Sequence, residues 1–114
     1  AIIPAGLCYP GRDAKGGDLP PVPECGPLWQ HRLRPLLPRI GLTLLGGGYA
    51  QRLYLGERVK PSLTRTVAAF GEYLPQFLAL PLLSWRNTGW LKREPWFEAQ
   101  VLPELRARVK ALLQ

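Results

Sequence analysis

The sequence predicts an α/β fold in which helices cover both faces of a parallel sheet. Three short apolar runs fit buried strands, at residues 1–5, 40–45 and 76–80. Helical periodicity occupies much of the remaining chain, and alternating strands and helices are typical of a parallel sheet. Sites in such sheets lie beyond the carboxyl ends of the strands. We therefore expect the loops that follow the strands to share one edge: 6–27, 46–48 and 81–90.

Size and composition limit the class of protein. The chain has 114 residues, of which 46% are hydrophobic, so we expect one globular domain, residues 1–114, and not a disordered chain. No apolar run approaches the roughly 20 residues that a membrane span needs, and no signal peptide with a basic flank is visible. We expect no membrane partner, a cytoplasmic location and a monomer.

The start of the chain bears on its completeness. The sequence contains no Met and opens on Ala1-Ile2-Ile3, which fits the end of a buried strand. We expect that a part of the parent protein precedes Ala1. A processed or Met-trimmed start is the alternative.

The charge favours a polyanionic partner. Fifteen Lys and Arg oppose eight Asp and Glu, which gives a net charge of +7 and a pI near 10.0. Arginines dominate the basic residues, and the guanidinium is the better bidentate ligand for phosphate. We therefore expect a nucleic acid as partner. The alternative is that the charge only reflects solubility.

Helical spacing fits four segments, and prolines mark several of their ends. The segments are 28–37, 49–55, 62–74 and a last helix from about Pro95. Pro38 and Pro75 end the first and third of them, while Pro103 should kink the last. The long stretch 6–27 is dense in glycine and proline and is expected to be a loop.

The glycine turn at 46–48 is the first candidate site. Strand, glycine turn and helix in this order present backbone N–H groups and the positive end of a helix dipole to an anion. The candidate contacts are Gly47 and Gly48. A P-loop is excluded because its Lys-Ser/Thr pair is absent. The alternative is that the glycines only permit close packing of strand and helix.

The loop after the third strand is the second candidate site. It reads Ser84-Trp85-Arg86-Asn87-Thr88-Gly89-Trp90. Aromatic side chains stack on bases of any sequence, for about 1–3 kcal/mol per base, and an enzyme that flips a base needs such a wedge. The alternative is that Trp85 and Trp90 are core or capping aromatics, Trp90 more than Trp85.

The histidine and the cysteines give weaker signals. His31, the single histidine, lies in a polar patch on the expected solvent face of its helix, with no partner at a useful spacing. We expect no catalytic role for it. Cys8 and Cys25 permit one disulfide, two free thiols or half of a four-cysteine metal site.

Several motifs occur together and in order along nearly the whole chain. They are Ala1-Ile2-Ile3-Pro4 through Cys8-Tyr9-Pro10-Gly11, Gly17-Asp18-Leu19-Pro20-Pro21 with Glu24-Cys25, Leu44-Leu45-Gly46-Gly47-Gly48-Tyr49-Ala50-Gln51, and residues 81–91 followed by Pro95-Trp96-Phe97. In this series the sequence resembles the bacterial uracil-DNA glycosylase superfamily, in particular its iron–sulfur type branch and relatives.

The resemblance implies a fold, an activity and a cofactor. The family fold is a three-layer α/β/α sandwich around a short parallel sheet. Its members hydrolyse the N-glycosidic bond of uracil in DNA after flipping the base. By resemblance, Ser84, Trp85, Arg86 and Asn87 would enter the DNA groove, and Gly47 with the following helix start would lie near a phosphate. Cys8 and Cys25 look like the last two ligands of a four-cysteine 4Fe–4S cluster.

The sequence departs from the family pattern at its chemical positions. Leu82 stands in place of the motif His, and a leucine cannot donate a hydrogen bond to a uracil oxygen or stabilise a developing anion. Pro4 stands where the iron–sulfur branch has an Asn. The Gly-x-Ala-Pro-Gly type motif and the other two cluster cysteines would precede Ala1.

Three hypotheses therefore compete. The chain is the C-terminal part of a uracil-DNA glycosylase-like protein, with little or no excision activity by itself. The second hypothesis is a non-catalytic DNA-binding module derived from the same fold, which Leu82 favours. The third is a small α/β domain whose basic charge only serves solubility.

Overall fold

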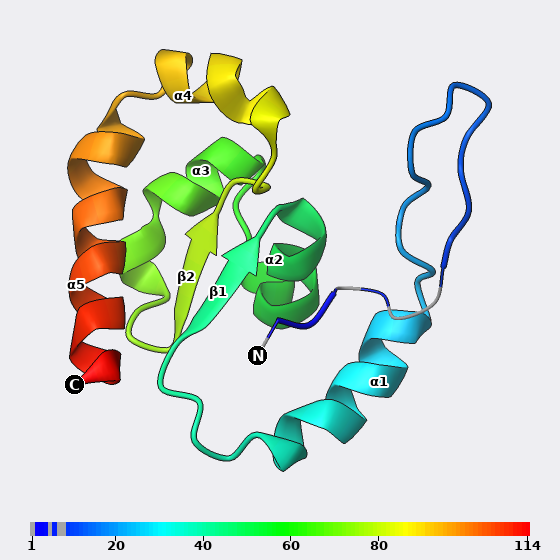
Figure 1. The fold of residues 1–114 in the computed structure, drawn as a ribbon, viewed down its shortest axis with the longest axis horizontal. Coiled ribbons are helices and arrows are strands. Elements are labelled where there is room, and N and C mark those ends of the chain that lie inside the picture. Colours follow the sequence, from blue (N-terminus) through cyan, green and yellow to red (C-terminus); the bar gives the residue numbers. More distant parts are fainter. Residues whose placement is uncertain (1, 5, 7–8) are drawn as a thin grey trace. The chain divides into compact units, whose positions relative to one another are not determined.

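The computed structural model describes residues 2–4, 6 and 9–114. By their contacts these residues fall into two units, Ala1–Ile40 and Gly41–Gln114. The second unit contains the sheet and is shown with the first in Figure 1. In the part of the chain that the structure describes, no helix has the length and apolarity to cross a bilayer.

A short parallel sheet forms the centre of the second unit, so the α/β prediction is confirmed. Strand β1 (Thr43–Gly46) pairs with β2 (Phe77–Leu80), with Thr43 opposite Phe77 and Gly46 opposite Leu80. Strand β2 lies within the expected run 76–80, and β1 overlaps the end of the expected run 40–45 and extends one residue beyond it. The expected strand at 1–5 is absent from its described residues 2–4, where Pro4 has no N–H to give to a ladder; Ala1 and Ala5 lie outside the described residues.

Helices and short turns connect and follow the two strands. Helix α2 (Gly48–Leu55) leads from β1 into a 3₁₀ turn (Gly56–Arg58), and α3 (Leu63–Ala68) leads into a second (Phe70–Glu72). A third 3₁₀ turn (Trp85–Asn87) continues directly into α4 (Thr88–Arg93). A π-helical turn (Phe97–Val101) then precedes α5 (Leu102–Leu113).

The predicted boundaries around α3 and α4 were wrong. Helix α3 begins after its cap Ser62, as predicted, but ends at Ala68, well before the expected residue 74. A 3₁₀ turn that contains Gly71 follows it, and glycine does not favour continuation of a helix. The expected loop 81–90 contains the whole 3₁₀ turn and the start of α4, whose first residues follow without a break.

A π turn precedes Pro103, the residue at which the sequence predicts a kink in the last helix. The Leu102 N–H donates to the Phe97 carbonyl, five positions earlier. Pro103 follows in the first turn of α5, where its missing N–H costs least. The wider turn just before it accommodates the ring, which is a recognised cause of a helix irregularity.

The core of the second unit consists of two apolar clusters that meet at β2. The larger cluster joins β2 to α3 and to the π turn: Val67, Leu78, Ala79, Leu80, Phe97 and Val101. The smaller joins both strands to α2 and the turn before β2: Leu45, Leu55, Tyr73 and Phe77. Because β2 supplies both clusters, all four of its residues are buried, as a continuous apolar run predicts.

The first unit contains one α-helix and a stabilised turn. Helix α1 (Cys25–Leu33) begins earlier than predicted and ends before Pro35, where a 3₁₀ turn (Arg34–Leu36) replaces it. In the predicted loop, Asp13 accepts hydrogen bonds at Oδ1 from the N–H groups of Lys15 and Gly17, at 2.8 and 2.9 Å. This local turn organises part of the loop without a helix or a long strand.

Candidate nucleic-acid interface

The segments that leave β1 and β2 meet at the carboxyl edge of the sheet, as predicted. The Gly47 N–H donates to the Leu80 carbonyl at 3.0 Å. Gly47 has a φ of +87°, and a Cβ atom at this position would lie 3.3 Å from Leu82 Cδ1. The positive φ therefore favours glycine here, and an added Cβ atom would press on the exposed Leu82 side chain. The third expected loop, 6–27, belongs to the other unit, and its place at this edge stays a prediction.

The glycine turn is shorter than predicted and carries a positive charge. Gly46 ends β1 and Gly48 begins α2, so Gly47 alone makes the turn. The Arg52 guanidinium lies close to this turn, since a Cβ atom added to Gly48 would be only 3.1 Å from Arg52 Nη1. The first turn of α2 has no acidic residue. The guanidinium and the helix dipole therefore add their positive potentials at one place.

Hydrogen bonds within the turn hold Trp85 out in solvent. Ser84 Oγ accepts from the Arg86 N–H at 3.2 Å, and the Ser84 carbonyl accepts from the Asn87 N–H at 3.0 Å. The Trp85 carbonyl accepts from Thr88 Oγ1 at 2.9 Å. Trp85 is 82% exposed at the first position of this turn. Ser84 thus shapes the loop, while Trp85 offers its ring.

Two arginine–aromatic pairs flank this edge. The Arg52 guanidinium carbon lies 5.0 Å from the ring centre of Tyr49 on α2. The Arg86 guanidinium carbon lies 5.5 Å from the ring centre of Trp85 after β2. Neither guanidinium forms an ion pair with a carboxylate of the described residues. Stacking keeps each cation beside an exposed ring, so both groups are available to a phosphate and a base.

Two exposed leucines, Leu82 and Leu83, lie between these pairs in the chain. We call the six residues together the edge surface: Tyr49, Arg52, Leu82, Leu83, Trp85 and Arg86. Leu82 and Leu83 are 61% and 85% exposed, although they follow directly on a buried strand and the buried Pro81. Neighbouring exposed apolar residues of this kind mark a binding surface more often than single ones do. Apart from Arg86, residues 81–90 contain no ionisable side chain.

Trp90 plays a different part from Trp85, as the structural alternative predicted. Its Nε1 donates to Thr64 Oγ1 at 2.9 Å. Its ring packs edge-on against Trp96 and Phe97, with centroid distances of 5.9 and 5.3 Å. Trp90 therefore joins α4 to the larger core cluster and is not part of the edge surface.

Three residues of this region were missed by the sequence analysis. Tyr49 and Arg52 were assigned to a helix without a role, although their spacing directly after the glycine turn places them on one face of its first turn. No role was predicted for Gln51. In the structure it is 2% exposed and donates to two backbone carbonyls; a polar residue amid an apolar helix face was the available signal.

Cys25 and His31 lie in the first unit. Cys25 is buried at the start of α1, and Cys8 lies outside the described residues. Among the residues that the structure describes, no three His, Cys, Asp or Glu side chains gather where they could hold a metal. The 4Fe–4S cluster and its two ligands therefore stay a prediction. His31 is exposed, as its position on the helix predicted.

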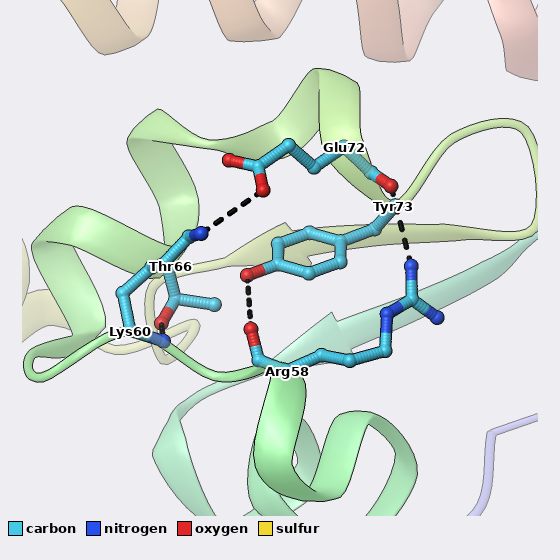
Figure 2. A network of polar contacts seen from close by, with 5 residues as sticks. All are labelled: Arg58, Lys60, Thr66, Glu72 and Tyr73. Carbon is cyan, nitrogen blue, oxygen red and sulfur yellow. Dashed lines mark hydrogen bonds and ion pairs between the residues drawn. The ribbon is translucent and has the colours of Figure 1, made fainter.

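A separate polar network fastens the turn after α2 to the turn before β2 (Figure 2). Tyr73 donates its hydroxyl to the Arg58 carbonyl at 2.7 Å, and Arg58 Nη2 donates to the Glu72 carbonyl at 3.2 Å. Lys60 Nζ lies 2.9 Å from Glu72 Oε1. This hydrogen bond and the attraction of the carboxylate raise the pKa of the Lys60 ammonium above its ordinary value. Because each cation of this network has a partner within it, we assign it to structure.

No protein-family model matches the chain.

Proposed function

We propose that this chain binds DNA through the edge surface. The observation that carries the proposal is two stacked arginines, Arg52 with Tyr49 and Arg86 with Trp85, one on each of the two segments that meet where Gly47 approaches Leu82. Exposed rings stack on bases of any sequence, and arginines contact the phosphates between them. The net charge of +7 supports a polyanionic partner.

The geometry favours binding over catalysis. Hydrolysis of an N-glycosidic bond needs a group that activates water and a donor that stabilises the developing anion. The segment 81–90 would supply the donor that stabilises the anion. It has Leu82 beside Gly47, and its only ionisable side chain is Arg86. A binding module derived from the glycosylase fold is therefore the function that we propose first.

Uracil excision is the second candidate, and one observation favours it. Leu82, which stands in place of the motif His, adjoins the glycine turn that the resemblance places near a phosphate. The arrangement of a glycosylase pocket would thus be kept around a changed residue. Robust excision of uracil from DNA by this chain would reverse the order of the two candidates.

A salt titration tests DNA binding. Fluorescence anisotropy of labelled single-stranded and duplex oligonucleotides is measured over a series of KCl concentrations. We expect the logarithm of the association constant to fall linearly with the logarithm of the salt concentration. Removing one phosphate contact by Arg52→Ala or Arg86→Ala should reduce this slope by about 1.

The matched control is Arg65→Ala, an exposed arginine on α3. It removes the same charge from another part of the second unit and should leave the slope nearly unchanged. Equal reductions for Arg65 and for the two edge-surface arginines would show that net charge alone governs binding. No affinity at low salt would favour the third hypothesis, a basic domain without a DNA partner.

A further inference from the structure

The buried amide of Gln51 joins the ends of the two strands. Gln51 Nε2 donates to the Leu45 carbonyl of β1 at 3.2 Å and to the Leu80 carbonyl of β2 at 2.8 Å. Both protons of the amide nitrogen are thus used. The reverse orientation would place the amide oxygen against two carbonyl oxygens, so the hydrogen bonds fix which end faces the strands.

Backbone bonds close the network around the glycine turn. The Leu80 carbonyl also accepts from the Gly47 N–H at 3.0 Å, and the Gly47 carbonyl accepts from the Gln51 N–H at 3.2 Å. The first turn of α2 is therefore tied to both strands where they end. A buried amide is costly unless it is hydrogen-bonded, and an apolar residue of similar size would fill the same volume. The polar residue specifies geometry that packing alone does not.

The two segments that this network joins carry the two halves of the edge surface. Tyr49 and Arg52 lie in the same helical turn as Gln51, and Trp85 and Arg86 follow Leu80 through the short segment 81–84. We propose that Gln51 is a positioning residue for DNA binding, which holds the Tyr49–Arg52 pair and the Trp85–Arg86 pair at a fixed spacing. This inference rests on the proposed function, because it concerns the same surface.

A double-mutant cycle separates positioning from general stability. The variants are Gln51→Leu, Trp85→Ala and the combination, with Gln51→Met as a second unbranched replacement that lacks the amide. Thermal unfolding first shows that each variant is folded at the assay temperature. Affinity for a fluorescein-labelled thymine oligonucleotide is then measured by anisotropy.

We expect Gln51→Leu to weaken binding about tenfold when Trp85 is present and much less when Trp85 is already removed, because the two effects are coupled. Gln51→Met should behave in the same way. A loss by the same factor in both backgrounds, or no loss in either, overturns the inference. If the wild-type chain binds no oligonucleotide, the proposed function fails and the inference falls with it.

Hydrogen exchange adds a readout that needs no DNA, and its first part uses the wild-type chain alone. In the wild-type chain, NMR should show slow exchange of the Gln51 side-chain amide protons; exchange at the rate of a free amide overturns the inference. In Gln51→Leu, the N–H groups of Gly47 and Asn87 should exchange about three- to tenfold faster, as the loss of one hydrogen bond predicts. The Ala69 N–H, which donates to the Arg65 carbonyl at the end of α3, is the internal control and should not change.

Discussion

Trp85 and Trp90 lie in one short stretch that the sequence presents as a single aromatic loop, yet they have opposite surroundings. Trp90 has a hydrogen-bond acceptor for its indole N–H and packs against two further rings. Trp85 extends into solvent beside Arg86. The difference shows that a side chain whose polar and apolar parts are both satisfied within the fold contributes to stability. One that is left exposed on a hydrogen-bonded turn is available to a partner.

The largest expected effect comes from truncating the packed ring. Trp90→Ala should lower the free energy of unfolding by about 3 kcal/mol, near the lower end for a large aromatic side chain because the ring is only partly buried. Urea denaturation followed by circular dichroism measures this. Trp85→Ala is the matched control, and its free energy of unfolding should stay within about 0.5 kcal/mol of the wild type. Equal losses would remove the distinction between the two tryptophans.

The glycine turn that brings Leu82 to the edge is the next most sensitive position. Gly47→Ala should destabilise the chain by about 1–2 kcal/mol because of its left-handed backbone angle, and Leu82 must also move. Gly46→Ala is the matched control: Gly46 has no positive φ, and no atom lies within 4 Å of an added Cβ. Thermal unfolding of both variants gives the comparison. A Gly46 variant as destabilised as the Gly47 variant would contradict the account of the turn.

Two threonines that contact the tryptophans extend the comparison to single hydrogen bonds. Thr64→Val leaves the Trp90 N–H without its acceptor and should cost about 1 kcal/mol of stability. Thr88→Val removes an exposed bond to the Trp85 carbonyl, and its cost should be below about 0.5 kcal/mol. Chemical denaturation of the two variants measures the difference. A larger cost at Thr88 would mean that the Trp85 turn, not the Trp90 contact, limits stability.

The smallest effect concerns Lys60, which is exposed and remote from both rings in sequence. Its hydrogen bond to Glu72 raises its pKa above the ordinary 10.5. A group whose pKa is raised in the folded state stabilises the fold below its unfolded-state pKa, and this contribution is lost as the pH rises through the folded-state value. Melting curves of wild type and Lys60→Met should therefore differ slightly at pH 9, and the difference should shrink as the pH rises through the raised pKa of Lys60. A difference that grows with pH would contradict this assignment.

The sequence was sufficient for the parallel strands and for the meeting of the glycine turn with the segment after β2. Those predictions rest on apolar runs and on glycine, whose effects on the backbone depend on residues that are adjacent in the sequence. The partners of Trp90 and Gln51 could not be predicted, because Thr64 and Leu80 are distant in the chain and hydrogen bonds of this kind leave no periodic pattern in the sequence. The end of α3 was missed because the apolar repeat continues to Leu74, whereas the α-helical backbone ends at Ala68.

The central claim is tested most directly by comparing two arginine–tryptophan pairs of equal geometry. Arg32 lies 5.5 Å from the ring centre of Trp29 in the first unit, as Arg86 does from that of Trp85. Anisotropy titrations of Trp85→Ala and Trp29→Ala with the same labelled oligonucleotide give the answer. We expect Trp85→Ala to weaken binding about 5- to 150-fold, the loss of one stacked base, and Trp29→Ala to change it less than about twofold. Equal losses, or an unchanged affinity for Trp85→Ala, would contradict DNA binding through the edge surface.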